Sequence, residues 1–202
     1  MQFKTPYVAK LIYPGLLWDM PSDENKIYLT FDDGPHPEIT PLVLNLLDNY
    51  NAKATFFCVG ENVKKHPETF EFLKQKGHAV GNHSHNHLNG WKTANKDYYK
   101  NVELANKLID SKLFRPPYGR ISPSQIKHLK KDYKIIMWSA LSYDFDARVS
   151  KKECLERSIK NSTAGTIIVF HDSEKAKEKM LFALEGYLKH FSKSGIEFCA
   201  LK

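Results

Sequence analysis

The sequence predicts a single-domain α/β protein, a distorted (β/α)7 barrel of parallel strands. The apolar residues alternate along the chain between short strand-like runs and segments with a helical period. About seven such strands occur, and each but the last is followed by a helical segment, which is typical of parallel strands joined by right-handed crossovers. No GxGxxG follows the first strand, and this absence favours closure into a barrel over an open dinucleotide-binding sheet.

The first strand and helix show the two periods clearly. Residues 26–31 (KIYLTF) read as a strand that ends at Asp-Asp-Gly-Pro, and the apolar residues from Ile39 to Tyr50 recur every three or four positions. The other predicted strands lie near residues 54–59, 78–82, 113–116, 133–138, 166–170 and 196–201. The other predicted helices lie near residues 61–76, 94–110, 122–131, 150–160 and 174–191.

Composition excludes several classes of protein. The 202 residues include 30 Lys+Arg and 23 Asp+Glu, a net charge of +7, and this length suffices for one buried core. No apolar run is long enough to span a bilayer, so we expect no transmembrane segment. Three cysteines make a disulfide framework implausible, and no basic stripe with interleaved aromatics indicates a nucleic-acid partner. No pattern predicts an oligomeric state.

The first 25 residues form a separate segment. Their apolar run, Leu11–Trp18, is broken by Pro-Gly and is followed by Asp-Met-Pro instead of a small-residue cleavage site. We therefore expect an arm, residues 1–25, that packs on a domain of residues 26–202, and no cleaved export signal. Localisation stays open between the cytoplasm, the default, and the envelope, whose anionic polymers suit a positive chain.

Titratable side chains gather at the predicted carboxyl ends of the strands, where parallel α/β proteins carry their chemistry. Asp32 and Asp33 are followed at once by Gly-Pro, which allows the chain to turn and both carboxylates to face one cavity. Two such close carboxylates repel each other unless a cation or a proton intervenes, so one would bind a metal while the other acts as a base. A turn cap is the equally weighted alternative.

His83 and His87 are spaced i, i+4, which would place both rings on one face of a helical turn with Cβ atoms about 5–6 Å apart. Two histidines and one carboxylate form the ligand set of hydrolytic zinc sites, although the same set also holds non-haem iron. The alternative is a cluster of surface polar groups. His85 would point elsewhere and has no metal role.

Two further strand ends carry candidate groups. His171 follows an apolar run and could protonate a leaving group near neutral pH, although a core histidine is the simpler alternative. Arg115 could orient a carboxylate through a bidentate pair. Tyr118 lies in the same Pro-rich loop, whose backbone amide could face an oxyanion.

In this order, these segments resemble the polysaccharide deacetylases (carbohydrate esterase family 4, the NodB homology domain). Thr30–Pro35 (TFDDGP) is similar to the first motif of the family, and His83–His87 (HSxxH) to the second. Arg115–Gly119 (RPPYG) is similar to the third, and Val169–Asp172 (VFHD) to the fifth. The resemblance runs from about residue 26 to the C-terminus, and the first two motifs together are highly specific.

The resemblance implies one divalent metal ion, zinc first and cobalt or nickel as alternatives, held by Asp33, His83 and His87. It also implies a distorted barrel of about seven strands.

The remaining roles are likewise implied by the resemblance. Asp32 would be the general base and would be held by Arg115. His171 would be the general acid, and the backbone at Tyr118 would stabilise the oxyanion. Asp144 would tune the histidine or pair with the arginine.

The fourth motif departs from the family. Leu141 replaces an Asp and Phe145 a Trp, whereas Asp144 is retained, and Asp146 is a candidate substitute for the missing acid. The departure bears on the size of the acyl group and on the substrate more than on the type of reaction.

We therefore expect a metal-dependent hydrolase that removes N-acetyl or a similar acyl group from amino-sugar glycans such as peptidoglycan or chitin. A hydrolase of another amide or of an O-acetyl ester, and a non-catalytic carbohydrate-binding barrel, are the alternatives.

The remaining histidines, tryptophan and cysteines receive simpler interpretations. Trp91 is interpreted equally as a sugar platform or as packing, and Cys58 and Cys199 as inert core thiols. The histidines interpreted as surface, loop or helix-end residues are His36, His66, His78, His128 and His190.

Overall fold

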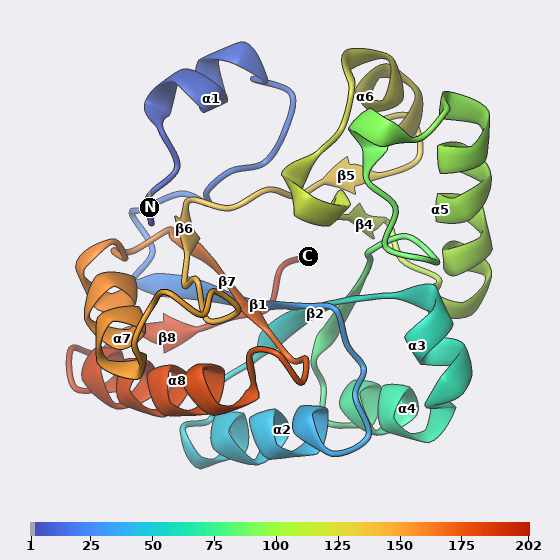
Figure 1. Ribbon diagram of the computed structural model, residues 1–202. Helices are drawn as coiled ribbons and strands as arrows, with labels where there is room; N and C mark the ends of the chain where they lie inside the picture. Colours follow the sequence, from blue (N-terminus) through green and yellow to red (C-terminus); the bar gives the residue numbers. More distant parts are fainter. Residues whose placement is uncertain (1–2) are drawn as a thin grey trace.

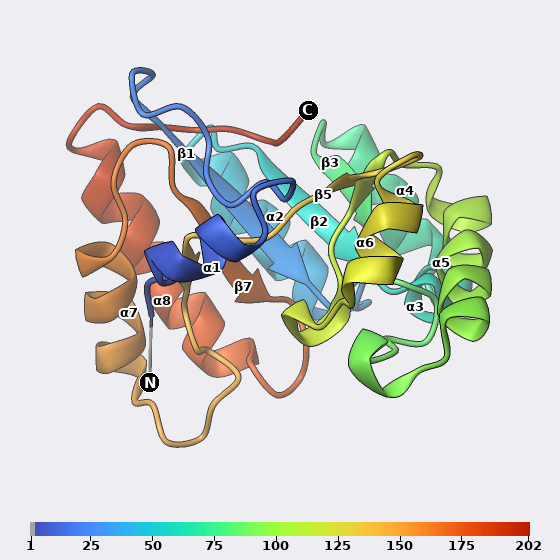
Figure 2. The ribbon, with the colours of Figure 1, turned by 90° about the horizontal axis from the view of Figure 1, so that it is seen from above.

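The computed structural model describes residues 3–202, and its parallel strands form a curled half-barrel with the helices outside (Figures 1 and 2). The strands run in the order β5-β4-β3-β2-β1-β7-β6, and β8 pairs with the start of β1. Their bounds are β1 Lys26–Asp32, β2 Ala54–Cys58, β3 Ala79–Asn82, β4 Leu113–Phe114, β5 Lys134–Ile135, β6 Ala140–Leu141, β7 Ile167–His171 and β8 Glu197–Phe198. The predicted distorted (β/α)7 barrel is confirmed.

The helices follow the strands as the periodicity predicts, except that one predicted helix is divided into two. Their bounds are α2 Ile39–Asn49, α3 Gly60–Lys65, α4 Pro67–Gln75, α5 Asn95–Ile109, α6 Pro123–Leu129, α7 Lys151–Lys160 and α8 Lys177–Ser192. The single helix expected over residues 61–76 is therefore wrong. Pro67 has no N–H and forces His66 out of the helical conformation (φ −131°, ψ 57°), so the chain starts a new helix there.

The predicted fifth strand, residues 133–138, is also wrong in detail. Only β5 falls within these residues, and a further short strand that was not predicted, β6, follows it. The two strands form the two opposite edges of the sheet. Residues 136–139 join these edges directly, without a helix, across the open seam of the barrel. A short connection suffices because the sheet curls until its edges approach each other (Figure 1).

The N-terminal segment lies along this seam. The Thr5 amide donates to the Ser139 carbonyl (2.9 Å), and the Leu141 amide donates to the Phe3 carbonyl (2.9 Å). Leu17 pairs in the same way with residues 135 and 137. Between these anchors the short helix α1, Tyr7–Ile12, stands away from the sheet and has no buried residue. The first two residues of the expected arm lie outside the described part of the chain.

The two faces of β1 serve different purposes, because successive side chains of a strand alternate. Phe31 points to the helices and stacks between Phe56 (ring centroids 4.8 Å apart) and Phe170 (6.0 Å). Thr30 and Asp32 point into the barrel and are buried there. The apolar core on the helix side thus holds β1 in place, and the end of β1 carries polar side chains that lie at the mouth of the barrel.

Two expectations from composition concern cysteines and the membrane. All three cysteines are free thiols; Cys58 and Cys154 are buried and Cys199 is partly buried. Burial raises the pKa of each thiol, and Cys58 is a core thiol as expected, whereas Cys199 follows β8 and is only partly buried. Within residues 3–202, no helix has the length and apolar character needed to cross a bilayer.

Phe31→Ala should lower the free energy of unfolding by about 3–5 kcal/mol, because it removes a fully buried ring and leaves a cavity. Phe182→Ala is the matched control, since Phe182 is 47% exposed on α8 and should change stability by less than about 1 kcal/mol. Urea denaturation followed by circular dichroism measures both. Equal losses for the two variants would contradict the layering described above.

Candidate functional site

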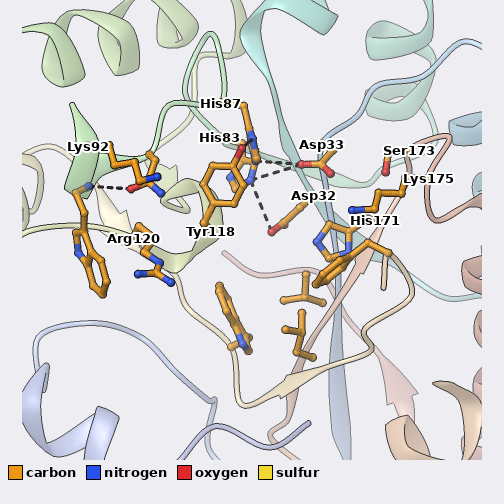
Figure 3. Close-up of a pocket in the computed structure, with 16 residues that line it drawn as sticks. Asp32, Asp33, His83, His87, Lys92, Tyr118, Arg120, His171, Ser173 and Lys175 are labelled. Atoms are coloured by element: carbon orange, nitrogen blue, oxygen red, sulfur yellow. Dashed lines mark hydrogen bonds and ion pairs between the residues drawn. The ribbon is translucent and has the colours of Figure 1, made fainter. Parts of the chain in front are cut away.

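A pocket with a volume of about 660 Å³ opens where the strands end at their carboxyl side (Figure 3). Its walls come from the end of β1, from the loops after β3, β4 and β6, and from the end of β7. The lining residues predicted as functional are Asp32, Asp33, His83, His87, Tyr118 and His171. Arg115 and Asp144 are fully buried behind this surface and do not line the pocket.

Asp32 and Asp33 both face the pocket because the chain turns sharply after β1. Asp32 ends the strand, and Asp33 adopts a left-handed backbone conformation (φ 83°). The next residue must be glycine, since a Cβ on Gly34 would lie 2.1 Å from a carboxylate oxygen of Asp172. The interpretation of this motif as a turn that presents two carboxylates therefore fits the geometry.

Asp172 is a site residue that the sequence analysis did not assign. Its buried carboxylate accepts hydrogen bonds from the Gly34 amide (3.0 Å) and from the Thr40 hydroxyl (2.5 Å). Asn62 supports the same loop by donating to the Asp33 carbonyl (2.7 Å). The available signal was the acid directly after His171, a second polar residue at the end of β7.

His83 and His87 come together, but not on a helical turn as expected. Residues 83–87 form a loop in which Ser84 (φ 61°) and His87 (φ 54°) are left-handed. The Asn82 side chain accepts from the Ser84 amide (2.8 Å) and holds this path. The centroids of the two rings lie 4.9 Å apart. The loop thus brings the two histidines together as the predicted helical turn would have done. His85, as expected, is not part of this group.

The donor atoms of Asp33, His83 and His87 converge. They all lie within 4.8 Å of one another, with His87 Nε2 3.2 Å and His83 Nε2 3.9 Å from Asp33 Oδ1. Donors about 2.0–2.1 Å from a tetrahedral zinc ion are themselves about 3.3 Å apart, so this spacing suits a metal.

The second ring nitrogens support the same conclusion. His83 Nδ1–H donates to the Arg115 carbonyl (2.8 Å), and His87 Nδ1 is hydrogen-bonded to the Tyr118 hydroxyl (3.1 Å). Each Nε2 is thereby turned toward Asp33, as in metal sites whose outer partners orient the ligands. Burial, and then the neighbouring His83, lower the pKa of His87 to about 4, so its ring is neutral and able to coordinate. The residues present fit a divalent ion.

Arg115 binds Asp32, although not as the bidentate pair considered from the sequence. Its Nη1 donates to Asp32 Oδ1 (2.7 Å) and to the Thr30 hydroxyl (2.7 Å). Its Nη2 and Nε instead donate to the carbonyls of Met137 (2.9 Å) and Ile136 (3.4 Å) in the seam. Burial raises the pKa of Asp32, but the Arg115 charge opposes it, and the net pKa is lowered. Asp32 is therefore ionised at neutral pH.

His171 is held by Asp144 through two contacts. The His171 Nδ1–H donates to Asp144 Oδ1 (2.8 Å), and the His171 backbone amide donates to Asp144 Oδ2 (2.8 Å). Burial lowers the pKa of His171, but the Asp144 charge and hydrogen bond outweigh it and raise the pKa to about 9. The imidazole is thus cationic at neutral pH, with Nε2 free to face the pocket.

Tyr118 contributes more than the backbone amide foreseen from the sequence. It is left-handed (φ 60°) in the short 3-10 turn Pro117–Gly119, whose Gly119 and Arg120 amides donate to the carbonyls of Pro116 and Pro117. The Tyr118 amide has no acceptor among the described residues. Its side chain adds the hydroxyl contact to His87, a role that no pattern in the sequence indicated.

The departures in the fourth motif form an apolar wall. Leu141 and Phe145 line the pocket beside Trp138 and Val169, and the Phe145 ring meets the His171 ring edge-on with centroids 4.8 Å apart. Asp146, considered as a substitute acid, points elsewhere.

The carboxylate of Asp146 pairs with Arg148 (2.6 Å), and the residue is not part of the pocket. It therefore does not replace the missing acid.

Two of the simpler interpretations need comment. Trp91 lines the pocket, is 58% exposed and carries the Arg120 guanidinium over its ring at 4.1 Å, an arrangement nearer to a platform than to core packing. His78 is not a surface residue. It is 6% exposed and accepts from the Ala54 amide (3.2 Å), and burial lowers its pKa to about 4.

Comparison with known proteins identifies the family. A sequence profile for polysaccharide deacetylases matches residues 19–134. The chain belongs to the polysaccharide deacetylase family. A Bacillus cereus protein, a peptidoglycan-N-acetylglucosamine deacetylase, is 33% identical over 194 residues, which cover 90% of this chain and 88% of that one. A chitooligosaccharide deacetylase of Azorhizobium caulinodans is 31% identical over 173 residues, which cover 81% of each chain.

A solved structure agrees with this assignment. The crystal structure of a peptidoglycan N-acetylglucosamine deacetylase, in complex with a naphthyl N-hydroxybenzamide, superposes with a TM-score of 0.86 and 30% identity. The match covers 98% of this chain and 95% of that one. Membership of this deacetylase family implies a metal ion, and the cluster of Asp33, His83 and His87 is where this chain could hold one.

Asp144→Asn should lower the pKa of His171 well below about 9, because it removes the largest of the effects that oppose burial, while the smaller effects of the Asp33 and Asp32 charges remain. In the native protein this raised pKa stabilises the fold fully below pH 6.5, and the contribution is lost as the pH rises through 9. NMR titration of the ring in chelator-treated protein measures the shift. Asp146→Asn is the control, and a similar shift in both variants would refute the pairing.

Proposed function

We propose that this polysaccharide deacetylase is a zinc-dependent amidohydrolase that removes N-acetyl groups from amino-sugar glycans of the peptidoglycan or chitin type. The observation that carries the proposal is the convergence of Asp33, His83 and His87 beside an ionised Asp32 and a cationic His171. The likeness to peptidoglycan and chitooligosaccharide deacetylases supports the substrate class.

In this proposal Asp33, His83 and His87 hold the ion. When bound, a divalent ion supplies Lewis-acid polarisation of the acyl carbonyl and lowers the pKa of a water molecule. Zinc is favoured because two imidazoles and one carboxylate leave a coordination position open. The hydrogen bonds at the Nδ1 atoms of His83 and His87 orient the Nε2 atoms of both rings toward Asp33, so the protein contributes a preformed ligand set.

Asp32 is proposed as the proton acceptor. Its Oδ1 is fixed by Arg115, while Oδ2 lies 3.9 Å from His83 Nε2, on the side of the metal ligands. An ionised carboxylate in that place can take the proton of the attacking water as the new C–O bond forms. Arg115 acts only through Asp32 and is a positioning residue.

His171 and Tyr118 are proposed to complete the reaction. The Tyr118 amide donates to the developing oxyanion, for which its backbone position at the pocket wall is suited. The His171 Nε2–H protonates the sugar nitrogen as the C–N bond breaks, and acetate and the free amine leave. Asp144 keeps the imidazole protonated and oriented until that step.

The alternatives predict different outcomes. A hydrolase of O-acetyl esters would release acetate from acetylated xylan in preference to chitooligosaccharides or peptidoglycan fragments. A non-catalytic binding barrel would release acetate from none of them, and it would have no use for the buried support of Asp32 and His171.

Asp32→Asn should reduce kcat for deacetylation of a chitooligosaccharide by about 10²–10⁴-fold, because the proton acceptor is lost while the metal ligands remain. Zinc affinity, measured by calorimetry, should change by less than about threefold. Circular dichroism checks that the unpaired Arg115 does not unfold the barrel. Retention of near-normal turnover by a folded variant would show that Asp32 is not the base.

His87→Ala should weaken zinc binding beyond the roughly 10–100-fold that loss of an outer-shell partner costs, because it removes a ligand. His85→Ala is the matched control in the same loop and should leave zinc affinity nearly unchanged. Competition with a chromophoric chelator measures both. Should the two variants bind zinc equally well, the assigned ligand set is incorrect.

A further inference from the structure

The mouth of the pocket carries three cations from three different loops. Lys92, Arg120 and Lys175 all line it. None of them forms an ion pair with a carboxylate within residues 3–202. Glu174, the acid next to Lys175 in sequence, instead faces His36 (3.2 Å). These three residues, Lys92, Arg120 and Lys175, are called the rim below. The rim carries a positive charge that no carboxylate of the described residues neutralises through an ion pair.

The two carboxylates that line the pocket do not neutralise this rim. Asp32 accepts from the buried Arg115, and Asp33 lies against His87. No other acid contributes to the walls among the described residues. A substrate entering this pocket therefore meets uncompensated positive charge outside the metal ligands.

Two of the cations are held in place by aromatic rings. The Arg120 guanidinium lies 4.1 Å from the Trp91 ring, and the Trp91 indole N–H is fixed to the Ile121 carbonyl (3.1 Å). The Lys175 ammonium lies 5.6 Å from the Phe145 ring. Such contacts restrict the side chains before binding, so less conformational entropy is lost when an anion is bound.

The cations flank the candidate metal ligands. In Figure 3, Lys92 and Arg120 lie on one side of Asp33, His83 and His87, and Lys175 lies on the other side beside His171. When the N-acyl group of a sugar reaches the metal ligands, the other substituents of that sugar would therefore lie close to one of these cations.

We propose that this rim selects amino sugars that carry a carboxylate close to the N-acyl group, in preference to neutral chitin-type glycans. The proposal rests on the N-deacetylation proposed above and specifies its substrate. The planar guanidinium of Arg120 is suited to bind a carboxylate through two parallel hydrogen bonds, and Lys175 adds a second positive charge. A neutral glycan would leave both without a charged partner.

The test compares one glycan in two charge states. The probe is a peptidoglycan oligosaccharide freed of its stem peptides, so that its N-acetylmuramic acid residues carry free carboxylates, and its control is the same oligosaccharide with these carboxylates converted to methyl esters. The acid should have a kcat/KM at least about tenfold above that of the ester, and the ratio should fall as salt screens the rim. Equal values for acid and ester would overturn the proposal.

Variants then assign the selectivity to the rim. Arg120→Gln, Lys175→Gln and the double variant should bring the acid-to-ester ratio toward one. Lys127→Gln, an exposed cation of α6 outside the pocket, should leave the ratio at its native value. An unchanged ratio in the double variant would overturn the assignment.

A binding measurement separates this proposal from the catalytic one. The dissociation constants of the acid and ester forms are measured by calorimetry with the Asp32→Asn variant. A preference of about tenfold for the acid supports the rim even where no acetate is released, and equal affinities refute it. Absence of acetate release by the native, zinc-loaded protein from either form and from a chitooligosaccharide would refute the proposed function instead.

Discussion

The buried guanidinium of Arg115 is the contact on which the arrangement of the site depends. It lies inside the barrel, 4.1 Å from the Phe57 ring, and binds the end of β1 and the seam at residues 136–137. Loss of one member of such a buried ion pair commonly costs about 3–5 kcal/mol, because the other charge stays buried without a partner. The same side chain thus links the end of β1 to residues 136–137 and fixes the carboxylate proposed to accept a proton.

The mouth of the barrel is built from residues with unfavourable backbone geometry. Asp33, His87 and Tyr118 all have positive φ, which side chains other than glycine seldom adopt. Residues held in such conformations persist where the surroundings determine them, and here those surroundings are specific. Asp172 and Asn62 hold the Asp33 loop, and the amide of Gly60, at the start of α3, binds the Ser84 carbonyl in the histidine loop.

Much of this architecture could be predicted from the sequence, and the failures have physical reasons. Periodicity located the strands other than β6, because a buried strand and an amphipathic helix leave different patterns, and the strand ends identified the pocket residues. The i, i+4 spacing of His83 and His87 correctly indicated their proximity but not the loop, because left-handed residues such as Ser84 leave no periodic trace. Asp172 was missed for a similar reason, since its role depends on contacts with Gly34 and Thr40 that are distant in sequence.

The electrostatics of the pocket separate two protonation states that the proposed reaction needs together. Arg115 keeps Asp32 ionised, and Asp144 keeps His171 protonated. At neutral pH the proposed proton acceptor therefore carries no proton, and the proposed proton donor carries one. This division has a chemical consequence, because a carboxylate whose pKa is lowered is a weak base. In the proposed reaction Asp32 would take its proton from a water molecule that a nearby cation had made more acidic. The three converging donors of Asp33, His83 and His87, placed beside Asp32, are where this chain could hold such a cation.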